Sequence, residues 1–249
     1  MFDRLKEIYY VSWADLRFMR HTMVNVLVMS LMAPLLYLLA FGYGMGRGIT
    51  IEGVSYIAFI VPGIVALTAL SASFSSTSSR MNVQRLYYRS FDEMMMGPLR
   101  PSSIVIGKSI LGVVRGLISC LIIFAIGMML TSELQFTPLF VLCMIVSCLT
   151  FSLLGETAAL LAKTHQSMST FSTLVILPMT FLCGTFFSIE SMPEWLRIVL
   201  YALPLTYSST SLRESALGWD FSYSSLAMLL AFGAAFYLVN MYLLKTRKV

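Results

Sequence analysis

Residues Ile104–Leu130 read IVIGKSILGVVRGLISCLIIFAIGMML, an apolar stretch with only two charged side chains, Lys108 and Arg115. A run of about 20 apolar residues is long enough to cross a hydrocarbon core of ~30 Å as a helix. The whole chain has this character, because 58% of its 249 residues are hydrophobic and 12% are charged. Soluble chains are about a quarter charged. The sequence therefore predicts an all-α, polytopic membrane protein.

Similar stretches lie elsewhere along the chain. They are too long for the alternating segments of about 10 residues that build outer-membrane barrels, so helical spans are expected. The two longer joins do not resemble soluble domains and no internal repeat is visible, so residues 1–249 are interpreted as a single transmembrane domain. Six transmembrane helices are predicted, at 22–42, 55–76, 104–130, 137–162, 168–187 and 223–244, with the longer joins at 77–103 and 188–222.

The first 21 residues predict an amphipathic helix at the membrane interface. Three acidic residues interrupt them, which the apolar core of a secretory signal would not contain. Apolar side chains recur at helical spacing and share one face, so the helix is expected to lie along the cytoplasmic headgroup layer. An ordinary solvated extension is the alternative. The apolar face is formed by Leu5, Tyr9, Trp13 and Leu16, and the acidic residues are Asp3, Glu7 and Asp15.

Lysine and arginine are unevenly divided between the two sides of the predicted spans. With a cytoplasmic N-terminus, thirteen of the 17 lie inside and three lie outside, and Arg115 belongs to neither group. The positive-inside rule then predicts a multi-pass protein with cytoplasmic N- and C-termini. The net charge of +5 is explained by this topology, with the lipid bilayer and its anionic inner leaflet as counterpart, and nucleic acid is not predicted as a partner.

Gly107-Lys108-Ser109 matches the end of a phosphate-binding loop. The complete motif needs a further glycine five residues before Gly107, where this chain has Ser102. The residues that follow form a membrane span instead of a helix packed on a soluble sheet. We therefore expect no nucleotide, no cofactor and no catalytic residue in this chain.

Cysteine and histidine do not predict a metal site. The cysteines fall inside predicted spans without a paired CxxC spacing, which favours small buried packing residues. The two histidines lie at cytoplasmic span ends with no second ligand at helical spacing, so headgroup-level polar residues are expected. These residues are Cys120, Cys143, Cys148, Cys183, His21 and His165.

The cytoplasmic join 77–103 contains Phe91–Met96 directly before Gly97-Pro98. Proline at 98 disfavours helical geometry at Gly97, so a short helix ending there is predicted beneath the membrane. Flexible methionine side chains suit insertion into a cleft of a partner protein, and plain packing is the alternative.

Two charges are predicted inside the membrane. Arg115 lies seven residues after Lys108 on an ascending span, and Glu156 lies seven residues before Lys163 on the next, descending one. At 1.5 Å per residue, both should lie ~10 Å from the cytoplasmic side. Isolated charges are costly at this depth, so the two are expected to form a pair or to face a wet cavity. The alternative is that Arg115 snorkels and Glu156 lies in headgroup water.

Four stretches together resemble one family, although each alone is a loose motif. Their order and the frame of six spans cover nearly the whole chain. The sequence is similar to the permease subunits of ABC exporters of the second type (ABC-2), which include exporters of drugs, nodulation factors and polysaccharides. The stretches are YIAFIVPG (56–63), EMMMGP with IVIGK (93–98 and 104–108), CGTFF (183–187), and MPEWL with PLTY and Leu212-Arg213 (192–196 and 204–213).

This resemblance implies a separate cytoplasmic ATPase dimer, which binds ATP and Mg and drives two permease copies. It also implies contacts to the ATPase from residues 1–20 and about 80–100, and short outer-leaflet re-entrant helices within 188–222. Pro193 and Pro204 suit first turns of such helices and Gly218 suits an end. The candidate ATPase-coupling residues are Arg89, Asp92, Glu93, Met94, Met95, Met96 and Pro98, and the candidate outer gate is Phe186, Phe187, Trp195 and Tyr207.

The expected function is therefore the export of an amphipathic or lipid-linked molecule from the cytoplasm or the inner leaflet. Two alternatives remain open. A secondary transporter or channel would usually have more ionisable residues in its spans or inverted repeats. A membrane-embedded enzyme would need a reactive cluster, and no such motif is found. The sequence leaves the substrate unspecified.

Overall fold

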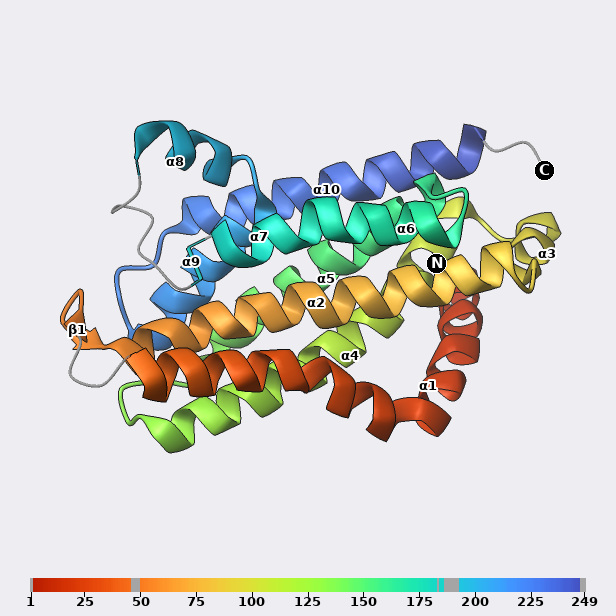
Figure 1. The fold of residues 1–249 in the computed structure, drawn as a ribbon. Coiled ribbons are helices and arrows are strands. Elements are labelled where there is room, and N and C mark those ends of the chain that lie inside the picture. The colour runs from red at the N-terminus through yellow and green to blue at the C-terminus, as the bar shows by residue number, and fades with distance from the viewer. Residues whose placement is uncertain (1, 46–49, 183, 186–192, 247–249) are drawn as a thin grey trace.

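The structure is a computed structural model that describes residues 2–45, 50–182, 184–185 and 193–246. Long helices run side by side along one axis and form a bundle (Figure 1). The elements are α1 (Phe2–Tyr37), η1 (Leu38–Met45, a π-helix), β1 (Thr50–Ile51), β2 (Val54–Ser55), α2 (Tyr56–Leu86), α3 (Ser90–Met96), α4 (Pro101–Leu130), α5 (Pro138–Leu161), α6 (His165–Phe171), η2 (Ser172–Ile176, a π-helix), α7 (Leu177–Leu182), α8 (Glu194–Tyr201), α9 (Pro204–Leu217) and α10 (Tyr223–Thr246).

Helix α2 is the centre of the bundle, and most of its residues are buried. Helices α4 and α5 pack closely on it because small residues let the backbones approach. A methyl group at Gly155 would lie 2.8 Å from the carbonyl oxygen of Phe74. Hydroxyl groups join the three helices, since Thr77 and Ser152 are 2.7 Å apart and Ser152 donates to the carbonyl of Ser109. The core therefore combines apolar packing with short polar contacts.

Four described helices are long and apolar enough to cross a membrane, namely α2, α4, α5 and α10. They correspond to four of the six predicted spans. The first predicted span falls on α1 and η1, where the apolar part, Leu27–Gly42, is shorter. The fifth falls on α6, η2 and α7, which follow one another as a helical segment alongside α2 (Figure 1).

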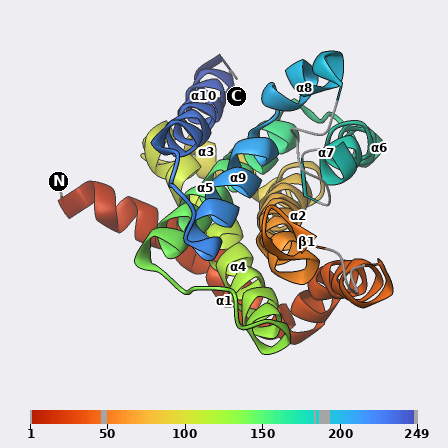
Figure 2. The same cartoon turned by 90° about the vertical axis from the view of Figure 1, so that its left-hand side faces the viewer.

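The amphipathic helix and the first span are one continuous helix, α1, which changes direction along its length. Viewed along the bundle, its N-terminal part runs outward across one end (Figure 2). The predicted apolar face of this part is largely exposed, with Leu5, Tyr9 and Trp13 at least half accessible. The end of the bundle that carries this segment also carries α3 and the C-terminal end of α10.

The short elements agree with the turn signals in the sequence, with one exception. Helix α3 ends at Met96 with Gly97 as its C-cap, and α9 begins at Pro204 and ends before Gly218 at φ 68°, as predicted. The predicted all-α class is confirmed, and β1 and β2 add one short antiparallel hairpin that the sequence did not predict. Its turn residues, Glu52 and Gly53, both have positive φ, the geometry of a tight two-residue hairpin.

Candidate functional site

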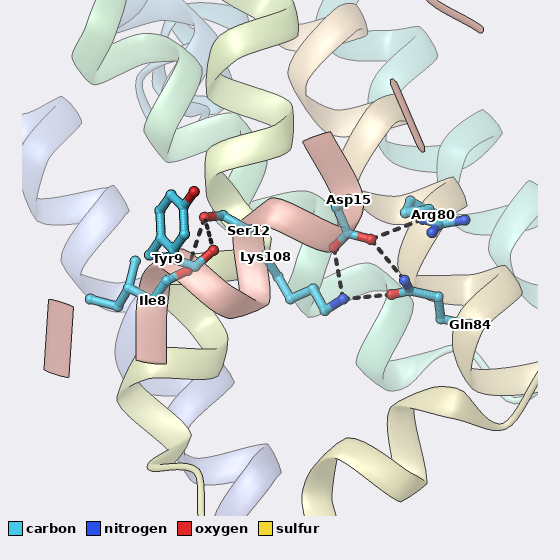
Figure 3. Close-up of polar contacts among 7 residues, drawn as sticks. All are labelled: Ile8, Tyr9, Ser12, Asp15, Arg80, Gln84 and Lys108. Carbon is cyan, nitrogen blue, oxygen red and sulfur yellow. Dashed lines mark hydrogen bonds and ion pairs between the residues drawn. The ribbon is translucent and has the colours of Figure 1, made fainter. Parts of the chain in front are cut away.

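A buried cluster of charged and polar side chains joins three helices at the end of the bundle that carries α3 (Figure 3). Its centre is the Asp15 carboxylate of α1, which is 0% exposed. One carboxylate oxygen accepts from Lys108 Nζ of α4 at 2.7 Å. The other accepts from Arg80 Nε at 2.9 Å and from Gln84 Nε2 at 2.8 Å, both on α2. Lys108 Nζ also donates to Gln84 Oε1 at 2.7 Å, so the four side chains form a closed network.

Local sequence explains why these groups meet. Arg80 and Gln84 are four residues apart, so they share one face of α2. On α1, Val11 and Asp15 share the face that turns toward the protein, opposite the exposed aromatic residues. Residue 107 is glycine where α1 crosses α4, and a methyl group there would lie 2.7 Å from Val11 Cβ. The close crossing brings the next residue, Lys108, within reach of Asp15.

The geometry gives Lys108 a structural role. Its side chain is 4% exposed, and its ammonium group donates to two oxygens inside the protein. A phosphate-binding lysine must instead present that group to the ligand. The Gly-Lys-Ser sequence is thus part of a helix–helix junction. Sequence reasoning missed this cluster, because Asp15 was interpreted only as a residue that argues against a signal peptide.

Helix α3 lies next to this junction and presents a mixed surface. Met94 and Met95 pack against the core residues around Phe91, so part of the methionine run has the plain packing role. Met96 is 72% exposed, Glu93 is exposed and Asp92 is half-buried. Arg89 and Pro98 are exposed at the two ends, and Arg89 has φ 54° at the N-cap. Fewer of the predicted coupling residues are therefore exposed than the sequence suggested. Tyr87 and Tyr88, which were not among the predicted residues, are also exposed at this surface.

A second contact holds α1 to the start of α4. The Glu7 carboxylate accepts from the backbone N–H of Arg100 at 3.4 Å. A hydrogen bond from the Ser103 side chain, with that backbone contact, keeps the pKa of Glu7 below its ordinary value. Glu7 and Asp15, about two turns apart, thus both anchor α1 to the first turns of α4.

Comparison with known proteins agrees with this architecture. The ABC-2 type transporter family model matches residues 6–217. The chain belongs to the ABC-2 type transporter family. It is 29% identical over 227 residues to the inner membrane transport permease YadH of Escherichia coli K12, covering 90% of this chain and 88% of that protein. It is also 29% identical over 189 residues to nodulation protein J of Rhizobium leguminosarum bv. viciae, covering 74% of this chain and 72% of that protein.

This ABC-2 chain is thus a transmembrane transporter component, and the homologues named as permeases agree with a protein that is not an enzyme.

Three of the four stretches that resemble the family meet at Arg213 of α9, namely those at 56–63, 183–187 and 204–213. This buried side chain donates to the carbonyls of Phe59 at 3.2 Å and Gly184 at 2.8 Å, and its guanidinium carbon lies 3.9 Å from the centre of the Phe59 ring. Those stretches therefore build a joint between α2, α9 and the segment around Gly184.

Among the described residues, Arg115 and Glu156 contact different neighbours. The ion pairs between described residues are those of Asp15 with Arg80 and Lys108. Glu156 is buried and faces α10, where Asn240 Nδ2 lies 3.4 Å from Glu156 Oε2. Arg115 instead faces α1 and α2 at the wall of a cavity. The sequence did not predict which neighbours the helix face of each residue would contact.

The predicted outer gate is only partly described. Phe186 and Phe187 lie outside the described residues. Trp195 on α8 is 70% exposed. Tyr207 on α9 donates to the carbonyl of Tyr201 at 2.8 Å and lines a polar cavity of about 400 Å³ at the end opposite α3. Tyr207 and Trp195 are thus on neighbouring short helices.

Of the predicted packing cysteines, Cys120, Cys143 and Cys148 are buried as expected, and Cys183 lies outside the described residues.

Proposed function

We propose that this chain is the membrane-embedded permease of an ATP-driven exporter and is powered by a separate cytoplasmic ATPase dimer that binds ATP and Mg. The observation that carries the proposal is the Asp15 network, which ties the interfacial part of α1 to α2 and α4. A partner that moves this part of α1 would move two transmembrane helices with it. A permease that has no nucleotide site of its own needs a contact of this kind, through which the ATPase can move its transmembrane helices.

The ATPase contact in this proposal combines α3 with the N-terminal part of α1. Both lie at one end of the bundle (Figure 1). Glu93, Met96 and the neighbouring tyrosines give α3 an exposed surface with acidic, apolar and aromatic groups. Glu7 and Asp15 fix α1 beside it, so one partner surface could contact both helices.

The topology in this proposal has six spans with both termini in the cytoplasm of a bacterium. The segment His165–Leu182 contains 18 helical residues, which at 1.5 Å per residue extend about 27 Å and approach the thickness of a hydrocarbon core. The apolar part of α1 and η1 supplies the first span. Lysine and arginine are concentrated at the span ends assigned to the cytoplasm, which supports this orientation. The last turn of α10 lies at the same end of the bundle as α3, so the C-terminus is on the side of the proposed ATPase contact.

Two copies of the permease would enclose the transport path in this proposal. The substrate would be amphipathic or lipid-linked and would leave from the cytoplasm or the inner leaflet. The polar cavity beside Tyr207, with α8 and α9 as short outer-leaflet helices, would form the exit. The E. coli homologue named as an inner membrane transport permease supports a transport role in that membrane.

The test is to co-express the permease with a candidate ABC ATPase from the same genome and to purify both in detergent. We expect ATP hydrolysis only when both are present, and Glu93→Lys should reduce copurification and permease-dependent hydrolysis at least several-fold. The matched control is Glu194→Lys, the same charge reversal on exposed α8 near the opposite end. Equal loss in both variants, or none in either, would contradict the proposed contact.

A transporter or channel that works without ATP is the alternative, and the same preparation separates the two. Permease alone in vesicles would then transport as fast as permease with its ATPase. ATP hydrolysis by purified permease that is lost in Lys108→Met without loss of stability would instead restore the nucleotide-site interpretation.

A further inference from the structure

A cavity of about 320 Å³ lies beside the Asp15 network, between α1, α2 and α4. This is within the size range of small-ligand sites, which begins at roughly 300 Å³. Two arginines and three serines line it together with an apolar wall. The lining is Phe18, Met19, Ser75, Ser76, Ser79, Arg80, Val83, Leu111 and Arg115.

Helical spacing explains why this cavity is both polar and basic. Ser75 and Ser79 are four residues apart on α2, as are Ser76 and Arg80, so they form adjacent rows on one side of that helix. Arg115 is four residues from Leu111 on α4 and reaches the same space. The first two residues of the lining, Phe18 and Met19, come from α1 and close one side of the cavity.

Positive charge is in excess around this space. Arg80 and Arg115 both line it, and no carboxylate is among the described residues of the lining. In the described part of the chain Arg80 bonds Asp15 through Nε, which leaves its two terminal nitrogens for an acceptor in the cavity.

Packing holds the Arg80 guanidinium in place. Its central carbon lies 3.9 Å from the centre of the Phe18 ring, so aromatic contact adds to the Asp15 bond. A planar guanidinium fixed in this way suits an anion with several oxygen acceptors. Serine hydroxyls can donate to the same oxygens. A phosphate group has the required charge and number of acceptors.

The depth of the cavity indicates what carries the phosphate. With the orientation of the proposed function, on which this step rests, α1 passes from the headgroup layer into the bilayer next to the cavity. Basic pockets between transmembrane helices on the cytoplasmic side bind anionic headgroups. Leu111, Val83 and Met19 give the cavity an apolar wall for the start of the acyl chains. We propose that it binds the phosphate of an anionic glycerophospholipid from the inner leaflet.

The test is a lipid titration of the purified permease in neutral detergent, read by native mass spectrometry and by melting temperature. Phosphatidylglycerol should be retained and should raise the melting temperature, and phosphatidylcholine should do neither. Losing one charge-assisted contact costs roughly 1.5–3 kcal/mol, so Arg115→Gln should need at least about ten-fold more phosphatidylglycerol for the same retention. Lys163→Gln is the matched control, because Lys163 is exposed and outside the cavity.

A second variant protects the test against misfolding. Ser79→Trp fills the cavity and removes no charge, so it should lose retention of phosphatidylglycerol while the protein elutes as the wild type does. Unchanged retention in that variant would overturn the proposal, as would an equal loss in Lys163→Gln. Stabilisation by inorganic phosphate that replaces the lipid effect would assign the site to a soluble anion and overturn the lipid assignment. None of these outcomes depends on the ATPase or on transport.

Discussion

Removing the charges of Asp15 and Lys108 separately and together tests whether their network holds α1 to the bundle. Lys108→Met leaves Asp15 with Arg80 and Gln84 but removes both hydrogen bonds of the ammonium group, to Asp15 and to Gln84, at roughly 1.5–3 kcal/mol each. Asp15→Asn leaves the buried ammonium of Lys108 without its counter-charge, and stranding a buried charge costs roughly 3–5 kcal/mol. Each single variant should therefore lose several kcal/mol of unfolding free energy.

The double variant gives the sharper result. With both charges gone, Arg80 is the one member of the network left charged, and its side chain is 19% exposed and can reach water. The double loss should therefore be smaller than the sum of the single losses by roughly 1–3 kcal/mol, the range for groups in direct contact. Lys163→Met is the matched control at an exposed lysine.

The measurement is the free energy of unfolding in mixed micelles, with copurification of the ATPase as a second reading. A double variant whose loss equals the sum would refute a coupled network. Equal stability of Lys108→Met and wild type would refute the structural role of Lys108 outright.

Three further predictions concern the same junction and the joint at the other end. Gly107→Ala should separate α1 from α4, because a methyl group would lie 2.7 Å from Val11 Cβ, and a cross-link between cysteines placed on the two helices should fall. Glu7→Gln should lower the melting temperature at neutral pH; because the pKa of Glu7 is lowered on folding, its contribution is complete above the ordinary value and is lost as pH falls through the lowered one, so the two proteins should converge in acid. Arg213→Leu should reduce the folded yield by removing buried hydrogen bonds worth roughly 1.5–3 kcal/mol each, and Arg213→Lys should not restore it, since lysine lacks the planar fork.

Much of the fold followed from local rules in the sequence. Long apolar stretches gave four membrane-length helices, and proline and glycine gave the ends of α3 and α9 within a residue. The β-hairpin was missed although Glu52-Gly53 is a turn signal. The sequence was searched for long apolar stretches, and a hairpin of six residues is too short to be found in that way. The continuity of α1 was also missed, since a change of direction within one helix has no length or composition signal.

The candidate site was less predictable, because it depends on which faces meet. Glu156 is buried, and its carboxylate lies beside Asn240 on α10, a neighbour that sequence distance does not reveal. Asp15 and Lys108 are 93 residues apart, and only the crossing at Gly107 brings them together. A buried position for Asp15 could have been inferred from its place opposite the exposed aromatic face of the same helix.

The energy of the Asp15 network also limits how force can pass through the chain. Separating α1 from α2 and α4 would strand buried charges at a cost of several kcal/mol. Tilting the three helices together avoids that cost, because the carboxylate keeps its three donors. A partner acting on the interfacial part of α1 therefore moves α2, the most buried helix of the bundle, before it breaks the junction. The double-variant experiment then measures the free energy with which Asp15 and Lys108 together hold this junction.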